Sequence, residues 1–255
     1  MPVSLQDKVA VIIGGAGGIG AATAKAMADA RGRVVITHRP DAPGSTAKSD
    51  EAAAILAGLA GSGHRAFPAD IANSATLNAL RDSVQETFGR ADILVNTAGF
   101  TKPIAHDNLD ALTDALIDEM FAVNWRGQFA AVRAFAPLLK ASGDGLIVSV
   151  SSIAGMNGAG SSIVYGATKA GIDVMTKSLG RALAPEIRVL GVSPGVVATE
   201  FVPGRGAEFN AKTAATTPLK RVAQAEDVAN AILACATHLT FSTGSTIVVD
   251  GGRAL

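Results

Sequence analysis

The sequence predicts an α/β protein in which a doubly wound parallel sheet of about seven strands is flanked by helices. Short apolar runs alternate with segments of helix-forming composition, which is the pattern of βαβ units. A glycine-rich turn follows the first apolar run directly. The chain of 255 residues fits one large domain, and no linker, repeat or low-complexity tract interrupts it. We therefore expect residues 1–255 to form a single domain.

The composition excludes several classes of function. The 22 basic and 22 acidic side chains balance, so no net field favours a nucleic acid or a membrane as partner. The single cysteine, Cys235, excludes an internal disulfide and a cysteine zinc site, and its apolar surroundings predict an inert buried thiol. We expect no metal site. The N-terminus has no apolar signal region, and no apolar run approaches the ~20 residues that span a bilayer, so we expect a cytoplasmic protein.

The first predicted strand, residues 8–13, is apolar after its lysine, as expected when helices cover both faces of the sheet. A glycine-rich turn over residues 14–20 and an alanine-rich helix over residues 21–30 follow. In this context glycines let the backbone approach a dinucleotide pyrophosphate at the helix N-terminus, although the spacing differs from G-x-G-x-x-G and a plain loop is the alternative. The candidate cofactor contacts in the turn are Gly14, Gly17, Gly18, Ile19 and Gly20.

The second predicted strand, residues 33–37, decides the cofactor type. An NAD-preferring site carries an acid near the end of this strand, to hold the ribose 2′-hydroxyl. His38 and Arg39 stand there instead, and Asp41 lies beyond a proline. Arg39 could bind a 2′-phosphate through its planar fork of donors, or it could be a plain surface arginine. The missing acid favours NADP(H), with NAD(H) as the alternative.

Polar residues also follow the third strand, residues 64–68, which comes after a helix at residues 51–60. Asp70 could accept a hydrogen bond from an adenine amino group, or it could cap the next helix, residues 74–88. Both interpretations remain open at this point. Ile71 is placed beside Asp70 in the candidate cofactor site.

The fourth strand, residues 92–95, leads into small residues that would let the backbone lie close to a cofactor ribose. The candidates there are Asn96, Ala98 and Gly99. A long helix is expected over residues 109–139, with Asn124 in an apolar part of it. Because a buried amide is costly unless bonded, Asn124 either ties structure together or bends the helix and holds a water.

The fifth strand, residues 146–150, ends just before Ser152. A helix beginning near Tyr165 contains the only tyrosine of the chain, and Lys169 follows four residues later, on the same helix face. A nearby ammonium lowers the pKa of a phenol from about 10. With the Ser152 hydroxyl, the pair could polarise a carbonyl and protonate it. The alternative is an amphipathic helix with a core tyrosine and a solvated lysine.

The remaining segments complete the predicted sheet. The sixth strand, residues 187–192, leads to candidate cofactor contacts at Pro194, Gly195, Val197 and Thr199. Residues 200–217 lose the apolar period and resemble a mobile flap over a site. A helix over residues 225–236 and a strand over residues 245–249 follow. Because ligands bind at the carboxyl ends of parallel strands, we expect the candidate residues to converge there.

These motifs resemble those of the short-chain dehydrogenase/reductase family over nearly the whole chain. The glycine turn is similar to T-G-x-x-x-G-x-G, with Ile13 replacing the threonine. The segment after the fourth strand is similar to N-N-A-G, with Thr97 replacing the second asparagine. The family's catalytic positions are all filled, and P-G-x-x-x-T follows the sixth strand. The matching catalytic residues are Asn124, Ser152, Tyr165 and Lys169.

The resemblance implies a Rossmann-type domain and a role for each of these residues. Tyr165 would exchange a proton with the substrate oxygen, and Ser152 would hydrogen-bond that oxygen. Lys169 would bind the nicotinamide ribose and lower the pKa of Tyr165, while Asn124 would hold a water that relays protons. The family's second basic position for a 2′-phosphate holds Gly17 here. The NADP(H) preference therefore depends on Arg39 and the missing acid.

The expected function is NADP(H)-dependent reduction of a ketone or 3-oxoacyl compound, as in members similar to 3-oxoacyl-[acyl-carrier-protein] reductase. The alternatives are an NAD-dependent dehydrogenase of a secondary alcohol or polyol, and a cofactor-binding regulator without catalysis. Mostly apolar pocket residues favour a neutral substrate, although Arg205 and Lys212 leave an acidic one open. The family forms dimers or tetramers through two long helices, and we expect the same here. The candidate substrate contacts are Ile153, Met156, Asn157 and Phe201.

Overall fold

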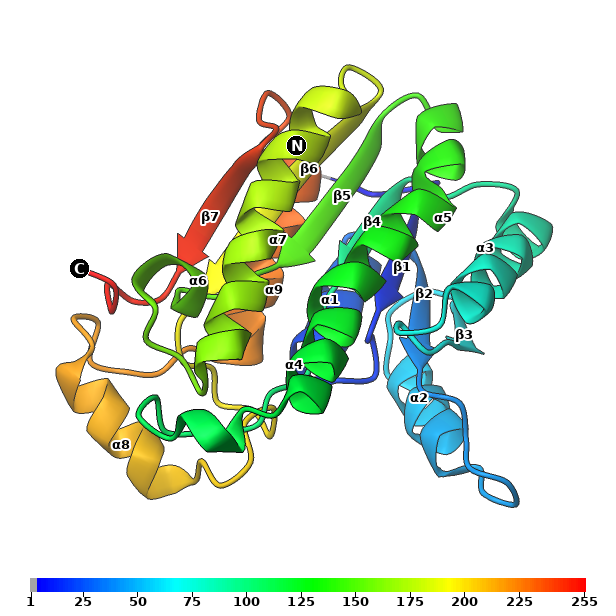
Figure 1. Ribbon diagram of the computed structural model, residues 1–255. Coiled ribbons are helices and arrows are strands. Elements are labelled where there is room, and N and C mark those ends of the chain that lie inside the picture. Colours follow the sequence, from blue (N-terminus) through cyan, green and yellow to red (C-terminus); the bar gives the residue numbers. More distant parts are fainter. Residues whose placement is uncertain (1–3) are drawn as a thin grey trace.

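A computed structural model describes residues 4–255 and contains a seven-stranded sheet in the order β3-β2-β1-β4-β5-β6-β7. Every neighbouring pair of strands is parallel, which confirms the predicted doubly wound sheet (Figure 1). The order runs outward in both directions from β1 and β4, so these two strands flank the switch point where such sheets bind ligands. The strands are β1 (Val9–Ile13), β2 (Arg33–His38), β3 (Arg65–Pro68), β4 (Ile93–Asn96), β5 (Gly145–Val150), β6 (Ile187–Pro194) and β7 (Ser245–Val249).

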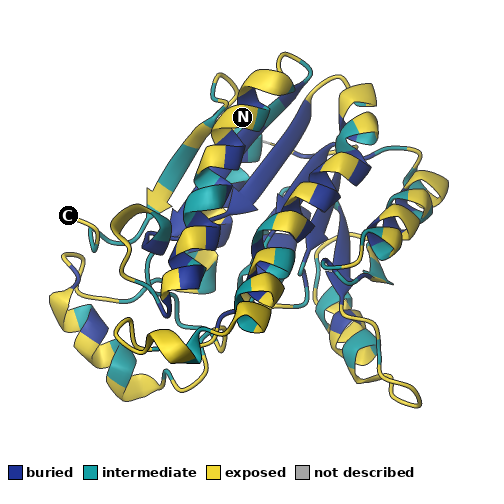
Figure 2. Ribbon diagram, viewed as in Figure 1, coloured by how far each residue is buried: buried dark blue, intermediate teal, exposed yellow. Residues whose placement is uncertain are grey.

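Helices cover both faces of the sheet, and each face has its own apolar core. Along β1, Val9, Val11 and Ile13 pack with α3 and α5, whereas Ala10 and Ile12 pack with α1, α2 and α9. This alternation explains why the central strands are apolar throughout and lie buried beneath half-exposed helices (Figure 2). The helices are α1 (Gly18–Asp29), α2 (Ala47–Ala57), α3 (Ser74–Phe88), α4 (Asp114–Phe121), α5 (Gly127–Ala141), α6 (Ala154–Asn157), α7 (Ile163–Ala182), α8 (Ala207–Thr216) and α9 (Ala225–Thr237). Among residues 4–255, no helix is long and apolar enough to cross a bilayer.

The helix expected over residues 109–139 is interrupted. A 3₁₀ turn, Leu109–Ala111, precedes α4, and a π-helical turn, Ala122–Arg126, separates α4 from α5. The π turn holds the buried Asn124, so the regular helix is interrupted at this amide. Pro137 lies inside α5 without ending it. Single π turns inside helices are frequent at functional sites.

The expected flap, residues 200–217, is partly helical, since it contains α8. The apolar period is missing because α8 is mostly exposed: Thr213 is its one buried residue. Its alanines favour a helix, and Glu208 pairs with Lys212 one turn later at 2.8 Å. In Figure 1, α8 lies beyond the carboxyl ends of β5 to β7.

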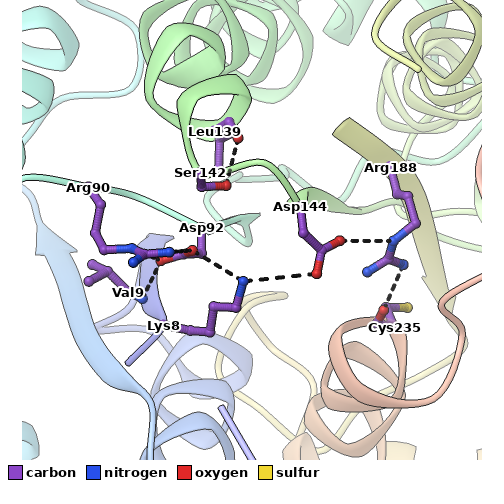
Figure 3. A network of polar contacts seen from close by, with 9 residues as sticks. All are labelled: Lys8, Val9, Arg90, Asp92, Leu139, Ser142, Asp144, Arg188 and Cys235. Atoms are coloured by element: carbon purple, nitrogen blue, oxygen red, sulfur yellow. Dashed lines mark hydrogen bonds and ion pairs between the residues drawn. The ribbon is translucent and has the colours of Figure 1, made fainter. Parts of the chain in front are cut away.

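An ionic network joins the opposite, amino ends of the strands (Figure 3). Asp92 is fully buried; its carboxylate accepts hydrogen bonds from the Val9 N–H at 2.9 Å and from the Arg90 guanidinium at 2.6 and 3.0 Å. The Lys8 ammonium lies 3.4 Å from Asp92 and 3.9 Å from Asp144. The network therefore links β1 to the segments that enter β4 and β5.

Cys235 lies beside this network, on α9, and is buried as expected. Burial raises the pKa of its thiol to about 11, although the nearby Arg188 charge acts in the opposite direction. The thiol is therefore protonated at neutral pH, which fits an inert core residue.

Candidate active site

A cleft of about 1850 Å³ lies at the carboxyl ends of the central strands. It is larger than the ~300–1,000 Å³ of ordinary small-ligand pockets, so it has room for a cofactor and a substrate together. Most of the sequence-predicted residues line it. They are Gly14, Gly17, Gly18, Ile19, Gly20, His38, Arg39, Asp70, Ile71, Ala98, Gly99, Ser152, Ile153, Asn157, Tyr165, Lys169, Pro194, Gly195, Val197, Thr199 and Phe201.

Three predicted residues do not line the cleft. Asn96 is fully buried at the end of β4, and its amide donates a hydrogen bond to the Ser149 hydroxyl of β5 at 3.3 Å. Met156 is mostly exposed, and its sulfur accepts a hydrogen bond from the Ser193 hydroxyl at 3.8 Å. The structure therefore places Asn96 in a supporting role between strands and Met156 outside the cleft. Asn124, the third, lies directly behind the cleft wall.

The glycine turn packs closely against the backbone of neighbouring segments. Gly14 has a positive φ of 81°, and a Cβ there would lie 2.7 Å from the Ala98 nitrogen. A Cβ on Gly20 would collide with the Gly14 carbonyl oxygen. Only glycine fits both positions, because any side chain would push the turn outward into the cleft.

Two threonine hydroxyls hold this turn in place. Thr37 Oγ1 accepts a hydrogen bond from the Gly14 N–H at 2.9 Å, and Thr97 Oγ1 donates to the Ile13 carbonyl oxygen at 2.8 Å. Thr97 is one of the two departures from the motifs that the sequence resembles, and Ile13 is the other. The turn is thus anchored from both neighbouring strands despite these departures.

The turn and the first residues of α1 fit the phosphates of a dinucleotide. The N-cap residue, Gly17, provides no side-chain cap to the helix, and the first backbone N–H groups of any helix lack partners within it. These N–H groups and the positive end of the helix dipole favour an anion. A Cβ on Gly18 would lie 2.8 Å from Thr199 Cγ2, so the segment after β6 closes against the turn.

His38 and Arg39 stand at the end of β2, and no acidic side chain stands there. Arg39 is exposed and lines the cleft. Asp41 does not line the cleft, and its carboxylate accepts the backbone N–H groups of Lys48 and Ser49 at 2.6 and 3.2 Å. Lys48 also lines the cleft, paired with Glu51 at 2.8 Å. Lys48 was not predicted from the sequence, because it lies in the polar first turn of α2 and not at the end of the strand.

Asp70 remains a candidate for binding the cofactor. Its carboxylate accepts the Ala72 N–H at 2.9 Å within the loop after β3. The N-cap of α3 is Asn73, whose side chain accepts the Ala75 N–H at 3.0 Å. The alternative in which Asp70 caps that helix is therefore wrong.

Ser152 and Tyr165 come from adjacent elements at the centre of the cleft. Ser152 follows β5 and is 9% exposed, and Tyr165 lies in the first turn of α7, where Ser162 accepts its N–H at 3.3 Å. Burial raises the pKa of Tyr165 to about 12; the Ser152 hydroxyl and the Arg205 charge act in the opposite direction but are outweighed. The sequence predicts that Lys169 lowers the pKa of Tyr165. The pKa of Tyr165 is raised instead, because burial is the largest effect on it.

Lys169 lies behind the phenol. Its ammonium nitrogen is 5.6 Å from the centre of the Tyr165 ring and donates to the Val150 carbonyl oxygen at 2.8 Å. Burial lowers the pKa of Lys169 to about 8, although the Asp173 carboxylate acts to raise it. The ammonium can therefore gain or lose a proton close to neutral pH.

Asn124 links the π turn to the loop after β4. Its side-chain oxygen accepts the Phe100 N–H at 2.9 Å, and its amide nitrogen donates to Phe100 O at 3.0 Å and Thr168 Oγ1 at 3.2 Å. A Cβ on Gly99 would lie 3.1 Å from Asn124 Oδ1 and 4.0 Å from Lys169 Nζ. Asn124 and Lys169 therefore flank the same glycine.

Comparisons with known proteins show what the chain is similar to. A family model described as Enoyl-(Acyl carrier protein) reductase matches residues 14–254. The chain is 35% identical to cis-4-hydroxycyclohexanecarboxylate dehydrogenase of Sinomonas cyclohexanicum, covering 99% of this chain and 98% of that protein. It is 32% identical to 3-oxoacyl-[acyl-carrier-protein] reductase of a Synechocystis strain, covering 99% of both. A crystal structure from Brucella melitensis, described as a short-chain dehydrogenase/reductase of the glucose/ribitol dehydrogenase type, superposes with a TM-score of 0.90 at 29% identity, covering 99% of both chains.

Proposed function

Because the chain belongs to the short-chain dehydrogenase/reductase family of NAD(P)-dependent oxidoreductases, we propose that it transfers a hydride between NADP(H) and a ketone or the matching secondary alcohol. The observation that carries this proposal is the convergence of the glycine turn, Ser152, Tyr165 and Lys169 on one cleft. When bound, the cofactor supplies or accepts the hydride. The roles below belong to side chains of the protein itself.

Tyr165 acts as the proton donor in reduction. With its pKa raised to about 12, the phenol is protonated at neutral pH and can give its proton to a carbonyl oxygen that gains negative charge. Ser152 donates a hydrogen bond to the same oxygen and fixes the carbonyl in position.

Lys169 and Asn124 support the proton donor. The Lys169 ammonium lies beside the phenol, and its lowered pKa lets it pass a proton on near neutral pH. In the proposed role it also binds the nicotinamide ribose hydroxyls. Asn124, adjacent across Gly99, would hold the water through which Lys169 exchanges protons with solvent.

The preference for NADP(H) is proposed from the end of β2. Arg39 lines the cleft, Lys48 adds a second cation, and Asp41 is occupied by the start of α2. Glu51 also lines the cleft, but its carboxylate is paired with Lys48. An NAD-dependent dehydrogenase is the second candidate, and comparing kcat/KM for NADPH and NADH decides between them.

The reaction itself is tested by screening ketones and secondary alcohols with both cofactors. The names of the relatives suggest two starting classes, 3-oxoacyl thioesters and cyclic secondary alcohols. Turnover of any of them supports the oxidoreductase proposal. Cofactor binding without turnover across the panel would support a regulator instead.

We also propose that the protein forms a homo-oligomer through the face made by α5 and α7. A groove of about 560 Å³ lies there, and its lining is mainly apolar. Trp125 and Phe129 stack beside it with ring centres 6.0 Å apart, and Phe129 is 36% exposed. Light scattering on the purified protein tests this proposal, since a monomer would contradict it. The apolar lining residues include Phe129, Val132, Ala136, Pro137, Leu179, Leu183 and Ile187.

A further inference from the structure

The cleft contains two arginines, Arg205 and Arg253, that the mechanism does not use. Building on the proposed carbonyl–alcohol reaction, we propose that the substrate carries a carboxylate and that these two arginines bind it beside Tyr165. The carboxylate would determine specificity and would take no part in the chemical step. The steps below follow from the position of each guanidinium and from the charges around it.

Arg205 lies on the substrate side of the cleft. It precedes α8, is half-buried, and its guanidinium carbon is 4.5 Å from the centre of the Phe209 ring. Its positive charge is close enough to Tyr165 to act on the pKa of the phenol. The phosphates of the cofactor are expected at the glycine turn, whereas Arg205 acts on the residue that protonates the substrate. This position favours a substrate group over a cofactor phosphate as the partner of Arg205.

Arg253 reaches the same region from the end of the chain. It follows the glycines after β7, is half-buried, and donates to the Thr216 hydroxyl at the end of α8 at 3.1 Å. Burial lowers the pKa of Arg205, Tyr165 acts to raise it, and the charge of Arg253 acts to lower it. Both guanidinium groups therefore belong to residues that line the same cleft, and their like charges repel one another.

Neither arginine forms an ion pair within the part of the chain that the structure describes. Neither Arg205 nor Arg253 has an acidic side chain within 4.0 Å there, although Glu200 and Glu226 also line the cleft. Lys212, the other basic candidate of the flap, is different. It is 77% exposed, pairs with Glu208 at 2.8 Å and does not line the cleft.

Neither half-buried guanidinium is paired with a carboxylate, so both can bind an anion that enters the cleft. A carboxylate matches the planar fork of donors and can accept from both arginines at once. The other candidate substrate contacts in the cleft are the apolar Ile153 and Phe201 and the polar Asn157. The site therefore suits a substrate with an apolar carbon skeleton, whose reacting carbonyl lies at Tyr165 and whose carboxylate lies at the opposite end. This inference favours the acidic substrate over the neutral one, both of which the sequence leaves open.

The test compares oxo acids with their primary amides, which differ in charge and little in shape. Pairs are measured with the carbonyl two, three and four carbons from the carboxyl carbon, using NADPH and NADH. For the best pair, we expect wild-type kcat/KM to favour the acid by about 10- to 100-fold, mainly through KM. Arg205→Met and Arg253→Met should each reduce this ratio at least several-fold, and the matched variant Lys212→Met should leave it unchanged.

Two outcomes separate this inference from the proposed reaction. If wild-type protein reduces acid and amide equally well, the reaction stands and the carboxylate inference is overturned. If wild-type protein reduces neither, the proposed reaction fails, and calorimetric titration of the folded protein with the same pairs decides the inference. Tighter binding of the acid that weakens in Arg205→Met supports it, and equal binding of acid and amide refutes it. Thermal unfolding of each variant controls for misfolding.

Discussion

The ammonium nitrogen of Lys169 lies 5.6 Å from the centre of the Tyr165 ring, and the Val150 carbonyl oxygen holds it there at 2.8 Å. Lys169 is buried and Tyr165 is half-buried, and desolvation disfavours the charged form of each. The pKa of Tyr165 is therefore raised to about 12 and that of Lys169 lowered to about 8. A neutral phenol thus lies beside an amine that exchanges its proton near neutral pH.

The lowered pKa of Lys169 predicts a specific dependence of stability on pH. Between about pH 8 and pH 10, the unfolded chain holds a proton on Lys169 that the folded chain tends to release. The free energy of unfolding should therefore rise with pH in this window, by up to about 1.4 kcal/mol per pH unit from this residue. Urea unfolding of wild-type protein and Lys169→Met across this range measures the difference. Parallel pH dependences for the two proteins would contradict the shift.

Asp173 should set the pH at which Lys169 loses its charge. Its half-buried carboxylate raises the pKa of Lys169, so Asp173→Asn should lower that pKa further. If charged Lys169 is needed for turnover, the alkaline limb of the kcat/KM profile moves to lower pH in this variant. Thr246→Val is the control, because it removes the 3.1 Å hydrogen bond to Asp173 and keeps the carboxylate. An unmoved alkaline limb in Asp173→Asn would show that Lys169 does not limit the rate there.

Arg39→Asp should shift the cofactor preference toward NADH. The change removes the guanidinium proposed to bind the 2′-phosphate and provides an acid for the ribose hydroxyls. We expect the ratio of kcat/KM for NADPH over NADH to fall about tenfold or more. Arg65→Asp is the matched control, since Arg65 is exposed at the amino end of the adjacent strand β3 and does not line the cleft. A wild-type preference for NADH would contradict the proposal before any variant is made.

Asp92→Asn should destabilise the fold and leave catalysis nearly intact. Asp92 is fully buried and accepts two hydrogen bonds from Arg90 at the edge of the sheet away from the cleft. Loss of its charge should lower the free energy of unfolding by about 2–3 kcal/mol. Asp144→Asn is the control: its side chain is 67% exposed, and a change within about 0.5 kcal/mol is expected. Equal effects of the two variants in urea unfolding would show that the buried network does not stabilise the sheet.

The fold could be predicted from the sequence because its central strands are buried on both faces. Such strands need uninterrupted apolar runs, and parallel pairing collects the residues that follow them at one edge. The positions of Gly14, Ser152 and Tyr165 in one cleft follow from this rule. The direction of a side chain does not follow from this rule. The sequence therefore predicts Asn96 and Met156 in the cleft, although neither lines it.

Other features depend on tertiary contacts that no local pattern reveals. Arg253 and Lys48 line the cleft although neither belongs to one of the motifs. The pKa of Tyr165 depends on whether burial or nearby charge is stronger, and only the depth of the phenol in the structure decides this. Helix α8 forms in a segment whose exposed surface removes the apolar period used to predict helices.

The substitution Tyr165→Phe tests the central claim most directly, because it removes one oxygen atom and little else. For the best substrate found in the screen, kcat/KM should fall by about 10²- to 10⁴-fold, while the dissociation constant for NADPH stays unchanged. Ser152→Ala, measured in parallel, should also lose activity and keep cofactor binding. Turnover by Tyr165→Phe at the wild-type rate would contradict the assignment of Tyr165 as the proton donor.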